Sequence, residues 1–212
     1  ILPSSLFDIV EEADDYYFPP LTGTYLRLTR ALIALMTYFV PVLYLLSTMH
    51  PTMLLIGYHS FYKDNINVPI ILQLLILELA LDGLRLAAVN TPNMLSTPLS
   101  ITAGIVLGEF SVKSGWFNSE SMVYMAFIFV ANYTQSSYEF GYALKFMRIL
   151  TLILTAIFDF WGFAAGVILF ISSMICNKTI SGYPYLYPVI PFSWKALSRR
   201  FFRSRLTDIE SK

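Results

Sequence analysis

Three ionisable residues stand inside an otherwise apolar stretch of the sequence, LLILELALDGLRL (74–86). They are Glu78, Asp82 and Arg85. On an α-helix, positions i, i+4 and i+7 fall on one face, so these side chains are expected to form a single ionic stripe. An ionisable side chain at the centre of a bilayer costs at least about 2.5–3.5 kcal/mol on insertion scales. The ionic stripe is therefore expected to face protein, water or its own members.

Two interpretations of the ionic stripe remain open. In the first, it borders a water-lined path or a subunit contact around a pore. In the second, it is a buried ion pair, or one face of an amphipathic helix that lies at the membrane interface. We favour an ion network that supports a pore over one that forms the pore itself.

A second pattern lies in the apolar run 98–113, where small residues recur at helical spacing: Ser100, Gly104, Gly108 and Ser111. Small-xxx-small spacing lets two helix backbones approach closely, and helices packed in this way can form a bundle or line a pore. Glu109 lies beside these small residues, near the expected helix end. If the protein conducts ions, this helix is expected to line the pathway. Plain helix packing explains the pattern equally well.

The composition indicates the environment of these helices. Of the 212 residues, 56% are hydrophobic and 13% are charged, and the mean hydropathy is +0.62. Soluble domains average about 45–50% apolar and about 25% charged residues. So few charges cannot cover a surface exposed to water, and an integral membrane protein is predicted. The formal net charge of zero gives no electrostatic basis for binding nucleic acid.

Sequence signatures of enzymes and metal centres are missing. The sequence contains no P-loop, no G-x-G-x-x-G and no G-x-S-x-G motif. His50 and His59 are the only histidines and Cys176 is the only cysteine, which makes a metal cluster or an intrachain disulfide implausible. We therefore expect no catalytic activity and no cofactor.

Five apolar runs are expected to form helices. The first contains Pro41, which should kink it; membrane helices tolerate such a proline where a neighbour satisfies the freed carbonyl. The fifth begins near Gly141 and stays apolar to Cys176. Its part from Ile149 to Cys176 alone would measure roughly 42 Å as one helix, more than a bilayer core of about 30 Å. We expect one long helix, with a break near Asp159–Gly162 as the alternative. Beside Asp159, Trp161 and Gly162 suggest a packing notch more than a proton relay.

Charged and aromatic residues near the runs predict the topology. Arg27 and Arg30 precede the first run and a basic tail ends the chain, so both ends are expected to be cytoplasmic. That arrangement needs an even number of crossings. We expect an all-α integral membrane fold with about four full transmembrane helices, plus one amphipathic or partly inserted helix with the ionic stripe. Tyrosines and cations in segment 133–148 are expected at the membrane–water interface.

Longer motifs together resemble a known family. In order along the chain they are DDYYFPPLTGTYLRLTR (14–30), MHP (49–51), ELALDGLR (78–85), YEFGYALKFMR (138–148) and GYPYLYPVIP (182–191). This set resembles the A-subunit family of spore germinant receptors, over nearly the whole chain and with order and spacing kept. VLGEFSVKSGWFNSESMVYMAF (106–127) and ICNKTISG (175–182) look most similar to the branch of stage V sporulation protein AF.

The resemblance implies a domain organisation. Family members have a soluble N-terminal domain followed by a membrane domain, and they lie in the inner membrane of bacterial endospores. By this resemblance, residues 1–24 are a juxtamembrane segment at the end of a soluble domain that precedes Ile1. Residues 25–192 are the transmembrane domain, and residues 193–212 are a basic cytoplasmic tail on the spore-core side.

The resemblance also implies a function. It predicts a subunit of an oligomeric, pentameric ion channel that releases monovalent ions or amplifies the germinant response. The expected partners are the lipid bilayer, further copies of the chain, and a small membrane partner or germinant receptor subunits. A non-conducting membrane scaffold for germination proteins is the alternative. A proton-coupled transporter that uses Glu78 and Asp82 is weaker, because the sequence shows no convincing inverted repeat.

Overall fold

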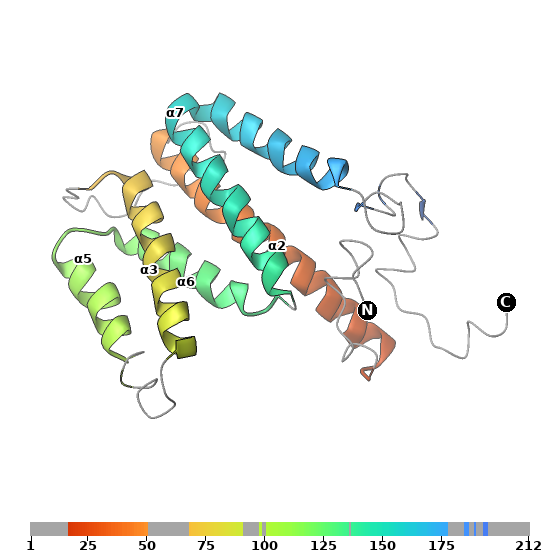
Figure 1. The fold of residues 1–212 in the computed structure, drawn as a ribbon, viewed down its shortest axis with the longest axis horizontal. Helices are drawn as coiled ribbons and strands as arrows, with labels where there is room; N and C mark the ends of the chain where they lie inside the picture. Colours follow the sequence, from red (N-terminus) through yellow and green to blue (C-terminus); the bar gives the residue numbers. More distant parts are fainter. Residues whose placement is uncertain are drawn as a thin grey trace. The chain divides into compact units, whose positions relative to one another are not determined.

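Every regular element in the described part of the chain is a helix, as expected. A computed structural model describes residues 17–50, 68–90, 98, 101–135, 137–177, 185–186, 189 and 193–194. Most of the expected juxtamembrane segment and basic tail therefore lies outside the described residues. The helices, drawn in Figure 1, are α2 (Pro20–Met49), α3 (Ile70–Asn90), the π-helix η2 (Gly104–Phe110), α5 (Ser111–Lys113), α6 (Ser119–Asn132) and α7 (Tyr138–Cys176).

The ends of α2 follow from proline chemistry. The helix begins at Pro20, where a missing backbone N–H leaves no hydrogen bond unmade. It ends at Met49 because the next residue, His50, precedes Pro51, and a residue before proline is disfavoured in the helical conformation. Pro41 lies inside the helix, as the sequence requires.

The chain divides into two compact units. The first unit comprises 1–38, 131–148 and 164–212, and the second comprises 39–130 and 149–163. In the first unit, Tyr38 of α2 stacks on Phe170 of α7, with ring centroids 4.2 Å apart. The second unit holds a hydrophobic core built from α2, α3, α6, the middle of α7 and the turn before α6: Val42, Tyr44, Leu45, Leu74, Leu77, Phe117, Met125, Ile128 and Leu152.

Helix α7 is broken at Asp159, so the expectation of one long helix was wrong (Figure 1). Asp159 has φ 59° and ψ −135°, a backbone conformation that residues other than glycine rarely adopt. A Cβ on Gly162 would collide with the carbonyl of Leu154, so only glycine fits this notch beside the break. The helix begins at Tyr138, earlier than the apolar run suggested, and its limbs 138–158 and 160–176 measure roughly 31 and 25 Å. The longer limb matches a bilayer core of about 30 Å, and the shorter limb falls below it.

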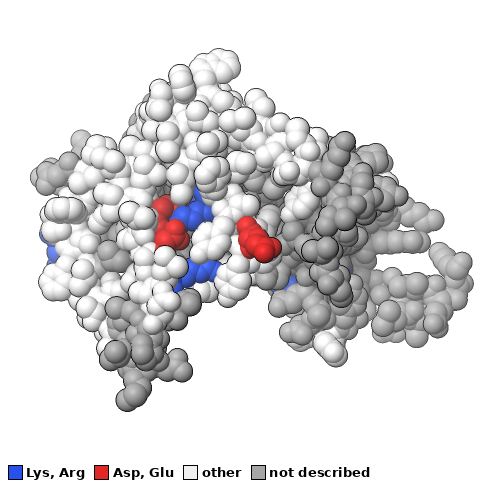
Figure 2. Space-filling model, in the orientation of Figure 1, with Lys and Arg blue, Asp and Glu red and all other residues white. Residues whose placement is uncertain are grey.

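Two described helices are long and apolar enough to cross a membrane. They are α2, with 30 residues, and α7, with 39. The four full spans expected from the sequence are not confirmed. Large apolar side chains stand on the surface of α7, including Trp161 at 79%, Phe146 at 66% and Ile168 at 65% exposure. Figure 2 shows a face with few charged side chains among the described residues, which is typical of a surface covered by lipid or by partners.

Run 98–113 is helical where it is described, but its turns widen. Residues 104–110 form a π-helix rather than an α-helix. Both the backbone N–H and the hydroxyl of Ser111 donate to the carbonyl of Val106, five residues earlier. Gly115, with φ 71°, lies in the turn after α5, and Asn118 precedes α6.

Candidate functional site

The ionic stripe on α3 begins inside the protein. Glu78 is 4% exposed, whereas Asp82 and Arg85 are half-buried. Each of the three has an interaction partner. A carboxylate so deeply buried needs such a partner, because desolvation of an isolated charge is costly. At Glu78 the stripe thus faces protein, one of the environments that the sequence allowed.

A buried hydrogen-bond network lies near the start of α3. The Gln73 amide donates to the carbonyl of Val68 over 2.8 Å, and its oxygen accepts from the backbone N–H of Asn118 over 2.8 Å. The Asn118 amide donates to the Tyr44 hydroxyl over 3.2 Å, and that hydroxyl bonds Ser121 over 3.2 Å. Gln73, Asn118, Tyr44 and Ser121 are all buried. The network therefore ties α2, α3 and α6 together within the second unit.

This network was not predicted from the sequence, although one local signal was present. Asn118 stands just before Ser119, where α6 begins, and asparagine is favoured at a helix N-cap. Its side-chain oxygen accepts from the backbone N–H of Glu120 over 3.3 Å. Nothing local in the sequence links this cap to Gln73, which lies 45 residues away.

The small residues of the π-helix are open. A Cβ on Gly104 or Gly108 would meet nothing within 4 Å, so these glycines do not serve close packing against other described residues. Ser111 is half-buried and bonds Val106, while Ser100 lies outside the described residues. The exposed Glu109 pairs with Lys113 one turn later, with Nζ and Oε1 2.5 Å apart. These residues line one exposed helix that ends in an ion pair.

Arg148 satisfies the carbonyl that Pro41 leaves without a donor. In a regular helix the Thr37 carbonyl accepts from the N–H of residue 41, but proline has none. The Arg148 guanidinium donates to this carbonyl over 2.7 Å, from a side chain with 0% exposure. The expectation that a neighbour satisfies the freed carbonyl is confirmed. Arg148 is fully buried in the protein, whereas Tyr133 and Tyr138 are exposed. The place of segment 133–148 at a membrane–water interface stays a prediction.

An acid–base pair holds the break in α7. His50, just after α2, lies with Nε2 2.5 Å from Oδ2 of Asp159. Both side chains are partly exposed, at 37% and 42%. This contact joins the residue after α2 to the break and so helps to hold Asp159 in its strained conformation. The residues are 109 positions apart, and no local sequence signal could have joined them.

Comparison with known proteins identifies the family. The whole chain, residues 1–212, matches the family described as Bacillus/Clostridium GerA spore germination protein. The chain belongs to the GerA family. This membership confirms the resemblance drawn from the motifs of the sequence.

Individual GerA-family relatives have sporulation and germination names. Stage V sporulation protein AF of Bacillus subtilis (strain 168) is 34% identical over 93% of this chain and 40% of its own length. Spore germination protein A1 of the same organism is 27% identical over 92% of this chain and 41% of its length. For spore germination protein KA the figures are 24%, 96% and 38%. The chain thus spans about two fifths of these relatives. No solved structure matches it significantly.

Proposed function

We propose that this GerA-family chain is a subunit of an oligomeric ion channel in the inner membrane of bacterial endospores. The channel is a homopentamer that releases monovalent ions during germination or amplifies the germinant response. Family membership over the whole chain and the germination names of its relatives support this role. Lipid covers the exposed apolar side chains, and a small membrane protein or germinant receptor subunits bind the assembly.

The observation that carries the proposal is the open pair of glycines on the π-helix. A glycine lowers the stability of a helix by about 1 kcal/mol relative to alanine. Gly104 and Gly108 make no close packing contact with other described residues that could compensate for this loss. We infer that their small size serves a neighbouring copy or an aqueous path. We propose that the 98–113 helix lies beside the pore, with the exposed Glu109–Lys113 pair near one end.

The ionic stripe has a supporting role in this proposal. Glu78 is buried in the protomer, and the Gln73–Asn118 network fixes the same helix, α3, in place. Such an arrangement holds the second unit rigid while leaving the glycine face of the π-helix free. The membrane domain has both ends on the spore-core side, following the basic residues at each end of the sequence.

A glycine substitution series tests the channel. Gly104→Leu and Gly108→Leu add bulk where the described part of the protomer has room, so the protomer should still fold. Gly83→Leu is the matched control, because Gly83 is also helical and open but lies on α3. The purified chain is reconstituted in planar bilayers and its ionic current is measured. We expect a current that both pore substitutions reduce at least several-fold and that Gly83→Leu leaves unchanged.

Two results would contradict the proposal. The first is the absence of current from the unmodified chain in a bilayer that contains correctly assembled oligomer, as judged by light scattering. The second is an unchanged current in both Gly104→Leu and Gly108→Leu, with the oligomer intact. The first result would refute the channel function, and the second would refute the assignment of the π-helix to the pore.

A further inference from the structure

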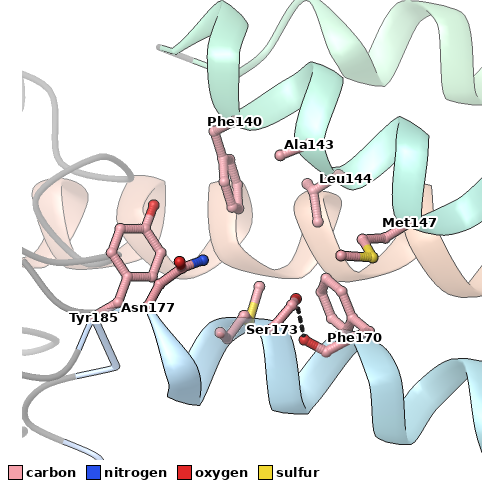
Figure 3. A pocket seen from close by; sticks show the side chains of 9 residues that line it. Phe140, Ala143, Leu144, Met147, Phe170, Ser173, Asn177 and Tyr185 are labelled. Atoms are coloured by element: carbon pink, nitrogen blue, oxygen red, sulfur yellow. Dashed lines mark hydrogen bonds between the residues drawn. The ribbon is translucent and has the colours of Figure 1, made fainter.

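A cavity of about 170 Å³ lies in the first unit, between the two limbs of α7. Figure 3 shows Phe140, Leu144 and Met147 from one limb facing Phe170 from the other. These side chains give the cavity an apolar interior. An engineered cavity of about 150 Å³ in another protein stays dry and binds benzene. The space is therefore large enough for one aromatic ring or a chain of about six carbons.

The cavity has a polar end. In Figure 3 the side chains of Asn177 and Tyr185 lie together at one side, away from Met147. The backbone N–H of Tyr185 donates to the carbonyl of Asn177 over 3.1 Å, which holds Tyr185 at the end of α7. Burial raises the pKa of the Tyr185 hydroxyl, so the group stays neutral and able to donate.

Within the described part of the chain, the polar side chains at this end bind no other side chain. No side-chain hydrogen bond joins Asn177 or Tyr185 to another residue in the described part of the chain. Ser173 also lines the cavity, but its hydroxyl already donates to the Phe170 carbonyl over 2.8 Å. The amide of Asn177 can donate and accept hydrogen bonds, and so can the hydroxyl of Tyr185. No lining side chain is charged, so nothing in the cavity would compensate the desolvation of an ion.

We propose that this cavity binds a small neutral amphiphile, with an aromatic or short aliphatic body between the α7 limbs and a hydroxyl or amide group at Asn177 and Tyr185. Such a ligand contacts both limbs, which meet at the break at Asp159. Occupancy therefore stabilises the bent form of α7 by mass action. The site does not depend on the channel role proposed above.

The experiment uses 4-fluorobenzyl alcohol as the probe and the full chain in lipid nanodiscs. Fluorine NMR separates saturable binding to the protein from partition into lipid, which empty nanodiscs measure. Ser173→Leu fills the cavity, and Ser172→Leu is the matched control, since Ser172 is exposed on the same limb and does not line the cavity. We expect saturable binding that weakens at least tenfold in Ser173→Leu and is unchanged in Ser172→Leu.

Analogues test the chemistry of the two ends. We expect 4-fluorotoluene, which lacks the hydroxyl, to bind several-fold more weakly, and 4-fluorobenzylammonium to show no saturable binding. Tyr185→Phe removes only the hydroxyl group. It should reduce the difference in binding affinity between 4-fluorobenzyl alcohol and 4-fluorotoluene. This comparison decides the matter if Ser173→Leu does not fold. Absence of saturable binding to the unmodified chain would overturn the proposal, as would equal binding by folded Ser173→Leu or an alcohol preference that Tyr185→Phe leaves unchanged.

Discussion

Replacing Arg148 by methionine should destabilise the protein through one carbonyl on a different helix. Arg148→Met keeps an unbranched side chain in a site with 0% exposure but removes the donor to the Thr37 oxygen. Because Pro41 has no N–H, this oxygen then loses its helical donor and its substitute together. The effect should therefore depend on which residue stands at position 41.

The magnitude follows from the 2.7 Å contact. A hydrogen bond from a charged donor contributes about 1.5–3 kcal/mol, and a buried acceptor left unsatisfied costs about 1–3 kcal/mol. These figures describe one loss from two sides, so we expect Arg148→Met to lower the free energy of unfolding by about 2–3 kcal/mol. Pro41→Ala restores the backbone N–H at position 41. In that background, Arg148→Met should cost about 1–2 kcal/mol less.

A double-mutant cycle measures this dependence. The four proteins are the unmodified chain, Arg148→Met, Pro41→Ala and the double variant, each unfolded by sodium dodecyl sulfate in mixed micelles and monitored by circular dichroism. Independent substitutions add within about 0.3–0.5 kcal/mol. A coupling energy below that limit would refute the assignment of Arg148 as the substitute donor for Pro41.

Three further tests of the fold use the same unfolding measurement. Asp159→Gly should be more stable than Asp159→Ala by about 1–3 kcal/mol, the reverse of the usual helix order, because only glycine relieves the backbone strain at φ 59°; equal stabilities would contradict this strain. Asn118→Ala should lower the free energy of unfolding by about 1–3 kcal/mol, because it removes the N-cap of α6 and the hydrogen bond to Tyr44. A neutral effect would argue against the buried network. Gly162→Ala should lower the free energy of unfolding by about 1–3 kcal/mol through overpacking. Gly141→Ala is the control on the same helix, where the described residues leave open space, and it should be neutral or stabilising. Similar effects at both sites would refute the packing notch at Gly162.

The helices could be predicted from the sequence because apolar runs and proline positions are local signals. The apolar run around Pro41 forms α2, and a neighbouring side chain, Arg148, donates to the carbonyl freed by this proline, as expected. The break at Asp159 was weighed but rejected, because the run was measured from Ile149 while the helix begins at Tyr138. The run itself was expected to begin near Gly141, but the length estimate left out the more polar turns before Ile149.

The identity of side-chain partners could not be predicted, because partners lie far apart in the sequence. Arg148 looked like an interfacial cation, and only the fold places it beside Thr37, 111 positions earlier. His50 and Asp159 are separated by 109 positions. The ionic stripe was predictable as one helix face, since its spacing is local, but the burial of Glu78 depends on tertiary packing.

The most direct test of the channel asks whether water-soluble reagent reaches the π-helix during conduction. In a Cys176→Ser background, which removes the sole cysteine, Gly108→Cys and the control Gly83→Cys are reconstituted in planar bilayers. A charged, membrane-impermeant thiosulfonate is added while current is recorded. If the π-helix lines the pore, the current through Gly108→Cys should fall with time and that through Gly83→Cys should stay constant. A conducting Gly108→Cys protein that the reagent does not affect would contradict the account.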